Sequence, residues 1–238
     1  MQHKDNIFIV SSLGRSGSSL MFDVLRYDTL YPNTSPDSRF NELTQSREVG
    51  ENQRNYFWKC HYRALEIVNT PIVRNKNIKN VFLYRDPIEI VLSLLSIYRK
   101  NREEYGLKGK KFIKSHCNNI KRNWDIPLIE VTENFETLIL EKDILELENM
   151  YDSFTNNHRF DTLMVKYESI WTHKNKIEDY VNGTINLPDK ENRDKKNNEY
   201  IRKSIVSDGE YKILNNTYKS LIQKIENSRD CWLIKKKL

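Results

Sequence analysis

The chain has 238 residues, of which 38% are hydrophobic and 11% aromatic, enough for one sizeable core. A formal net charge of +6 favours an anionic partner, which could be a nucleotide, an acidic glycan, a membrane surface or a nucleic acid. Three widely spaced cysteines suit neither a disulfide framework nor a Cys-rich zinc site, and they favour a reducing compartment.

The amino-terminal residues contain no apolar region of the kind that a signal peptide needs. No stretch of the sequence approaches the roughly 20 apolar residues of a membrane span. We therefore expect a soluble cytoplasmic protein in which residues 1–238 form a single domain.

The chain opens with a predicted strand at residues 7–10, a loop, and a helix at residues 18–27. Residues 28–55 are rich in proline, asparagine, aspartate and serine, which favour turns, and we interpret this segment as a candidate substrate lid. Further strands are predicted at residues 56–61, 80–84 and 160–165. Further helices are predicted at residues 64–68, 87–100, 112–124, 135–154, 177–181 and 211–225. The alternation predicts an α/β fold, a mostly parallel central sheet with helices on both faces.

The most informative motif is Gly14-Arg15-Ser16-Gly17-Ser18-Ser19, between the first strand and the first helix. Glycines allow a ligand to approach the backbone closely, and a helix N-terminus presents N–H groups to an anion. The motif therefore predicts a P-loop-like phosphate-binding loop. It lacks the Gly-Lys-[Ser/Thr] ending of a Walker A loop, and an ordinary serine-capped turn would also explain it.

Two further groups of polar residues follow later strands. Arg85 ends a strand and Ser93 lies eight residues later, so a guanidinium and a hydroxyl could share one phosphate, although Arg85 could instead pair with a nearby acid. Lys59 and His61 end the second strand and share one face of it. Ligands bind at the carboxyl edge of open α/β sheets, which favours a functional role for this lysine and histidine.

In this order, over roughly residues 7–170, these motifs resemble the sulfotransferases that use 3′-phosphoadenosine 5′-phosphosulfate (PAPS). The resemblance implies a 5′-phosphosulfate site at Arg15, Ser16, Gly17, Ser18 and Ser19, and a 3′-phosphate site at Arg85 and Ser93. Tyr167 matches a family tyrosine near the adenine. His61 matches the general base, and Lys59 and Arg15 would offset charge on the transferring group.

The resemblance implies transfer of a sulfuryl group from PAPS to an acceptor hydroxyl, without a metal. The Arg-Ser-Gly-Ser-Ser loop is similar to the carbohydrate branch, whereas Lys-x-His is similar to the cytosolic branch. We therefore expect a small-molecule or glycan acceptor, with a sugar hydroxyl preferred, and no specific nucleic-acid partner. The family's late basic loop has several candidates here, namely Arg193, Lys195, Arg202 and Lys203.

Two alternatives remain open at this point. A P-loop nucleotide kinase or NTPase would have the same order of strand, glycine-rich loop and helix, although its loop lysine is missing. A non-catalytic anion-binding module of the same fold would use basic segments such as residues 108–114 and 235–237, although such runs are usually solvated surface.

Overall fold

The computed structural model describes residues 6–28, 55–61, 63–69, 77–105, 134–190 and 205–237. Several sequence-based expectations lie outside these residues, namely the candidate lid, the helix at 112–124 and the four late basic candidates. The chain divides into two compact units. The first comprises Met1–Arg85, Asn149–Lys190 and Arg229–Leu238, and the second comprises Asp86–Glu148 and Glu191–Ser228.

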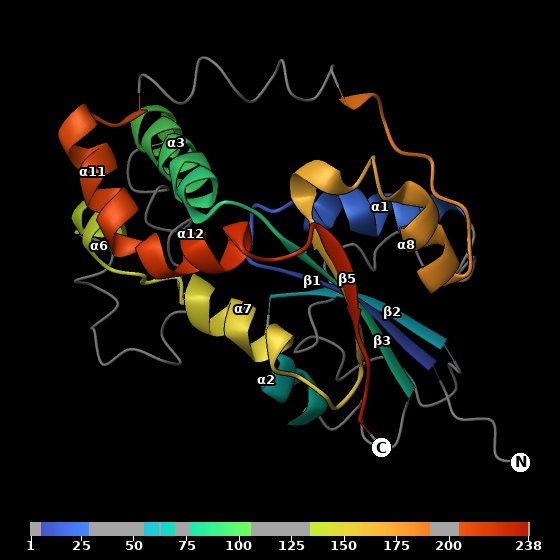
Figure 1. Ribbon diagram of the computed structural model, residues 1–238. Helices are drawn as coiled ribbons and strands as arrows, with labels where there is room; N and C mark the ends of the chain where they lie inside the picture. The colour runs from blue at the N-terminus through green and yellow to red at the C-terminus, as the bar shows by residue number, and fades with distance from the viewer. Residues whose placement is uncertain are drawn as a thin grey trace, which may run out of the picture. The chain divides into compact units, whose positions relative to one another are not determined.

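The first unit contains a five-stranded sheet in the order β2-β1-β3-β4-β5 (Figure 1). Its strands are β1 (Asn6–Ser12), β2 (Asn55–Cys60), β3 (Asn77–Tyr84), β4 (Asp161–Lys166) and β5 (Cys231–Ile234). The first four pair in parallel, and β5 pairs antiparallel with β4 at the edge. The α/β class and the mostly parallel sheet are therefore confirmed, whereas the short strand β5 was not predicted.

Helices cover both faces of this sheet. They are α1 (Ser18–Asp28), α2 (Ala64–Asn69), α7 (Leu147–Thr155) and α8 (Lys174–Val181), with a 3-10 turn, η5 (Tyr167–Ser169), after β4. In Figure 1, α1 and α8 lie on one side of the sheet and α2 and α7 on the other. This arrangement leaves the carboxyl ends of β1 to β4 at one common edge, since parallel strands end together.

Alternating side chains of β3 show how the two faces form separate cores. Val81 and Leu83 are fully buried in the cluster that includes α1 and α8. Phe82 points to the opposite face, where its ring stacks on Phe154 of α7 with centroids 4.2 Å apart. Tyr84 lies on that face as well, 5.5 Å from the Tyr151 ring. A strand that is buried on both faces has a continuous apolar sequence, and β3 could be predicted from that pattern.

The second unit holds α3 (Pro87–Tyr105), α6 (Phe135–Glu141), α11 (Asp208–Thr217) and α12 (Lys219–Glu226). The Asp86 carboxylate accepts the N–H of Ile88 at 2.8 Å, so Asp86 caps the start of α3. One apolar stripe of α3 is buried, and its members are Ile88, Val91, Leu92, Leu95 and Tyr98.

Two predicted helices are each divided into two. The helix predicted at 135–154 is two helices, and the first, α6, ends at Glu141. The second, α7, begins where the Asp143 carboxylate accepts the N–H groups of Leu147 and Glu148 at 3.0 Å. Glu146 has φ of 52°, which no α-helix allows. The helix predicted at 211–225 is interrupted at Tyr218, whose φ of −102° and ψ of 10° separate α11 from α12. At the start of α7, local capping by Asp143 therefore overrides a continuous apolar pattern.

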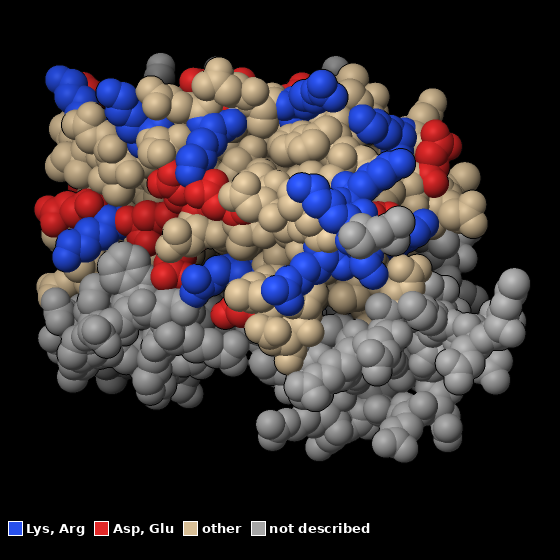
Figure 2. Space-filling view, turned by 60° about the horizontal axis from the view of Figure 1, so that its bottom comes forward, with Lys and Arg blue, Asp and Glu red and all other residues tan. Residues whose placement is uncertain are grey.

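Lysine and arginine side chains adjoin one another on the face shown in Figure 2, with several acidic side chains on the same face. The surface therefore carries charge of both signs, although the chain is basic in sum. Among the described helices, none is long and apolar enough to cross a membrane.

Candidate active site

The predicted phosphate-binding loop joins the end of β1 to the start of α1. Three of its residues have left-handed backbone: Gly14 with φ of 75°, Arg15 with φ of 46° and Gly17 with φ of 82°. Glycine adopts this conformation without a steric penalty, but arginine does so at a cost of roughly 1–2 kcal/mol. Strain of this kind clusters at ligand sites, so the conformation of Arg15 supports a functional loop.

Tyr167 packs directly against this loop. A Cβ atom added at Gly17 would lie 2.4 Å from two carbons of the Tyr167 ring, so only glycine fits there. Tyr167 is 8% exposed and belongs to the core cluster that includes residues of α1. The position of Tyr167 near an adenine ring stays a prediction, whereas its contact with Gly17 indicates that it supports the loop.

Lys59 and His61 contact opposite ends of the loop. Lys59 lies beside Val10 in the parallel register of β1 and β2, and its Nζ donates to Ser19 Oγ at 2.7 Å. His61 follows the last residue of β2, and its Nδ1 lies 3.2 Å from both the hydroxyl and the carbonyl oxygen of Ser12. The structure therefore places this lysine and histidine next to the loop.

Arg85 follows β3, the other neighbour of β1, and reaches Tyr167 and Glu168 beyond β4. Its guanidinium lies 5.1 Å from the centre of the Tyr167 ring, a cation–π contact. Its Nε donates to Glu168 Oε1 at 3.0 Å, and the Arg85 side chain is only 13% exposed. The carboxylate that binds Arg85 thus follows β4, whereas Arg85 itself follows β3.

Two guanidinium groups lie near each other at this strand edge. The pKa of Arg15 is lowered, first by loss of water around its guanidinium and then by the positive charge of Arg85. Arg15 is an exposed residue, so this desolvation is partial, and an arginine remains charged at neutral pH in any case. Bringing two like charges together is unfavourable, and a bound anion would offset that repulsion.

The serines of the loop have different environments. The Ser16 side chain is fully buried, and its hydroxyl donates to the carbonyl oxygen of Gly14 at 2.9 Å, so it stabilises the turn. Ser18 is 4% exposed as the first residue of α1, whereas Ser19 is exposed.

Ser93 lies half-buried in the second turn of α3. Because α3 belongs to the second unit, the pairing of Ser93 with Arg85 stays a prediction.

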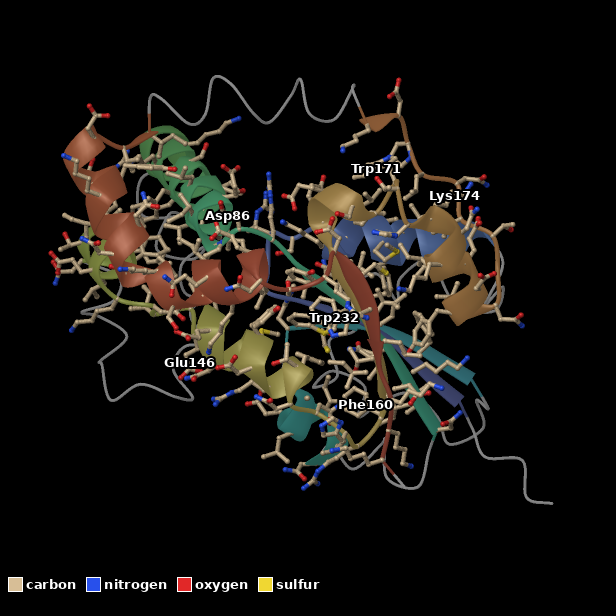
Figure 3. All side chains as sticks on the ribbon, in the orientation of Figure 1. Asp86, Glu146, Phe160, Trp171, Lys174 and Trp232 are labelled. Atoms are coloured by element: carbon tan, nitrogen blue, oxygen red, sulfur yellow. The ribbon has the colours of Figure 1, made fainter. Side chains whose placement is uncertain are left out.

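Sequence reasoning did not assign roles to three residues at this edge: Ser12, Glu168 and Trp171. Trp171 lies after η5 (Figure 3), and its ring is 5.9 Å from that of Tyr167. Its Nε1 donates to the carbonyl oxygen of Pro188 at 2.8 Å. The Nζ of Lys190 lies 5.8 Å from the Trp171 ring and donates to the carbonyl oxygen of Glu168 at 3.2 Å. In the sequence, Glu168 directly follows Tyr167, and Ser12 lies two residues before Gly14.

Within the described ranges, no group of three or more histidine, cysteine, aspartate or glutamate residues is placed to hold a metal ion. The described site consists of cations, one imidazole, hydroxyl groups, aromatic rings and the Glu168 carboxylate that binds Arg85.

No protein-family model and no curated protein matches the sequence. Among solved structures, the fold is similar to mouse sulfotransferase SULT7A1 complexed with PAP, with a TM-score of 0.48, 17% identity, and coverage of 97% of this chain and 87% of that one. It is also similar to retinol dehydratase in complex with retinol and PAP, with a TM-score of 0.43, 14% identity, and coverage of 94% and 82%. A third similar structure is retinol dehydratase with androsterone and inactive cofactor PAP, with a TM-score of 0.39, 13% identity, and coverage of 94% and 81%. Likeness at this level assigns no activity, so the functional argument depends on the site residues.

Proposed function

We propose that this chain is a sulfotransferase that moves a sulfuryl group from PAPS to an acceptor hydroxyl. The observation that carries the proposal is the pair of contacts from β2 to the loop. Lys59 Nζ is 2.7 Å from Ser19 Oγ at one end, and His61 Nδ1 is 3.2 Å from Ser12 Oγ at the other. A cation and a candidate base therefore flank a loop whose backbone suits a phosphate group.

The charges at the site suit the two ends of the donor. Arg15 lies in the loop that would receive the 5′-phosphosulfate, and Arg85 lies beside it at the end of β3. Arginine forks bind phosphate oxygens through two parallel hydrogen bonds, and Arg85 would read the 3′-phosphate in this way. Since ATP lacks a 3′-phosphate, Arg85 would select PAPS over ATP.

In the proposed reaction, the acceptor oxygen forms a bond to sulfur while the bond from sulfur to the 5′-phosphate oxygen breaks. His61 takes the acceptor proton, and the electron pair of the broken bond stays on the leaving phosphate. Lys59 and Arg15 would stabilise the charge that builds on that phosphate and on the bridging oxygen. The protein mainly positions the two substrates and stabilises charge, as in phosphoryl transfer.

For the acceptor, we propose a carbohydrate hydroxyl, because the Arg-Ser-Gly-Ser-Ser form of the loop is the feature that resembles the carbohydrate branch. A small phenol, an alcohol and a lipid head group are the alternatives for an acceptor screen. We propose that the reaction takes place in the cytoplasm, in keeping with the reducing compartment that the cysteine pattern favours.

The decisive experiment compares the thermal shift given by 3′-phosphoadenosine 5′-phosphate, the desulfated product, with that given by ADP and magnesium. A ligand at a hundred times its Kd adds about 2.7 kcal/mol, which is roughly 5–10 °C for a chain of this size. We expect a shift with the 3′-phosphorylated nucleotide, and loss of that shift in Arg85→Ala.

Other outcomes favour the alternatives. A shift with magnesium-ADP alone would favour the nucleotide kinase, and the sulfotransferase proposal would then be wrong. No shift with either nucleotide, together with salt-sensitive binding of a polyanion, would favour the binding module. Sulfuryl transfer that persists in a chelator would agree with the metal-free reaction proposed here.

A further inference from the structure

Ser12 is the last residue of β1, and it connects the loop to His61. It is completely buried, and its hydroxyl accepts the N–H of Gly14 at 3.1 Å. The same hydroxyl oxygen and the Ser12 carbonyl oxygen both lie 3.2 Å from His61 Nδ1. One residue of β1 thus presents two oxygens to a single imidazole nitrogen.

The chemistry of these two oxygens determines which nitrogen of His61 carries the proton. A carbonyl oxygen can only accept a hydrogen bond, so an unprotonated Nδ1 would place two lone pairs against each other. A protonated Nδ1 instead donates to both oxygens of Ser12. In a neutral imidazole the other nitrogen, Nε2, then holds the lone pair that can accept a proton.

We propose that Ser12 is a positioning residue that fixes His61 in the Nδ1–H form, with Nε2 as its basic nitrogen. Within the proposed sulfotransferase reaction, on which this consequence rests, Nε2 takes the proton of the acceptor hydroxyl. The carbonyl and the hydroxyl of Ser12 together favour this tautomer, and the hydroxyl also limits rotation of the ring. The tautomer itself is a property of the free protein and does not depend on the activity.

The neighbouring residue Ser11 offers a matched control. Ser11 is also completely buried at the end of β1, but its hydroxyl donates to Asn80 Oδ1 at 2.8 Å. Ser11→Ala and Ser12→Ala each remove one buried hydroxyl from adjacent positions of the same strand. Only Ser12→Ala removes a contact with His61, so a general loss of packing would affect both variants alike.

The first test is nitrogen-15 NMR of the free, full-length protein near neutral pH, with the His61 signals assigned through His61→Gln. We expect a protonated Nδ1 in the wild type and in Ser11→Ala, and an increased share of the other tautomer in Ser12→Ala. A wild-type His61 that is protonated mainly at Nε2 would overturn the proposal, whether or not the protein transfers sulfuryl groups.

The second test measures kcat at saturating donor. A net hydrogen bond of about 1 kcal/mol corresponds to roughly fivefold, so we expect kcat to fall about 3- to 10-fold in Ser12→Ala and to change little in Ser11→Ala. A raised donor KM with unchanged kcat would mean that Ser12 serves the loop through Gly14, and the inference would be wrong. Absence of transfer in the wild type would count against the proposed function, and NMR would still decide the tautomer.

Discussion

The Nε of Arg85 lies 3.0 Å from Oε1 of Glu168, so the residue proposed to read the 3′-phosphate already binds a carboxylate. An arginine fork has five N–H donors, and this contact uses the one on Nε. The carboxylate fixes the orientation of the fork, but its negative charge also opposes a phosphate at the same place. Glu168 should therefore weaken donor binding while it positions Arg85.

The isosteric change Glu168→Gln separates these two effects. Glutamine keeps an oxygen that can accept from Arg85 Nε but removes the negative charge, so we expect 3′-phosphoadenosine 5′-phosphate to bind several-fold more tightly. Glu168→Ala also removes the hydrogen bond and should lose part of that gain. Calorimetric titration measures both affinities, and Asp179→Asn, an exposed change on α8, controls for net charge. Weaker binding in Glu168→Gln would show that the charge of Glu168 helps the site.

His61→Ala tests the proposed base directly. General base catalysis typically contributes roughly 10² to 10⁴ in rate, so sulfuryl transfer should fall by that factor while donor affinity stays unchanged. The rate of transfer to the best acceptor and the affinity for the desulfated nucleotide give the two quantities. His158→Ala serves as the control, because His158 is exposed between α7 and β4. Equal rates in His61→Ala and the wild type would exclude His61 as the base.

Much of this site could be predicted because its parts are local in sequence. Buried parallel strands read as apolar runs, and polar residues directly after them come together at one edge, as Arg15, Lys59, His61 and Arg85 do. The contact between Arg85 and Glu168 could not be predicted, because it joins residues 83 positions apart and depends on how the side chains pack.

The helix boundaries show a second limit of the sequence. The periodic apolar residues of 135–154 continue through the break at Glu146, so only the capping contacts of Asp143 separate α6 from α7. The edge strand β5 was missed for another reason. It has four residues, and its pairing with β4 depends on the distant part of the chain that it meets.

Gly17→Ala tests whether the loop depends on its contact with Tyr167. The added methyl group would lie 2.4 Å from the ring, at a residue with φ of 82°, so the loop or the ring must move. Gly14→Ala is a matched control, since Gly14 has φ of 75° but its added Cβ meets nothing within 4 Å. Both variants carry a backbone penalty of roughly 1–2 kcal/mol, so their difference isolates the clash.

We expect Gly17→Ala to lose binding of 3′-phosphoadenosine 5′-phosphate at least tenfold more than Gly14→Ala does. Thermal unfolding with and without the nucleotide measures stability and binding on the same samples. Equal losses in the two variants would mean that backbone strain alone matters and that Tyr167 does not support the loop.

The start of α11 makes the stability of the second unit depend on pH. Ser207 Oγ accepts the N–H of Glu210, and the Ser207 N–H donates to Glu210 Oε2 at 2.7 Å, which forms a capping box. The backbone hydrogen bond from Ser207, followed by that from its hydroxyl, lowers the pKa of Glu210 from its ordinary value of 4.5. Because folding favours the carboxylate, this contribution is complete above pH 4.5 and is lost as pH falls through the lowered pKa.

Glu210→Gln should therefore flatten the acid limb of the stability curve. Glutamine retains an acceptor oxygen but does not titrate, so the free energy of unfolding should fall less steeply between about pH 5 and 3 than in the wild type. Ser207→Ala removes the other half of the box, and it should cost about 0.5–2 kcal/mol near neutral pH and also reduce the slope. Urea unfolding followed by circular dichroism at a series of pH values measures all three proteins. Parallel acid limbs in the wild type and Glu210→Gln would mean that the Glu210 carboxylate gains nothing from Ser207 on folding.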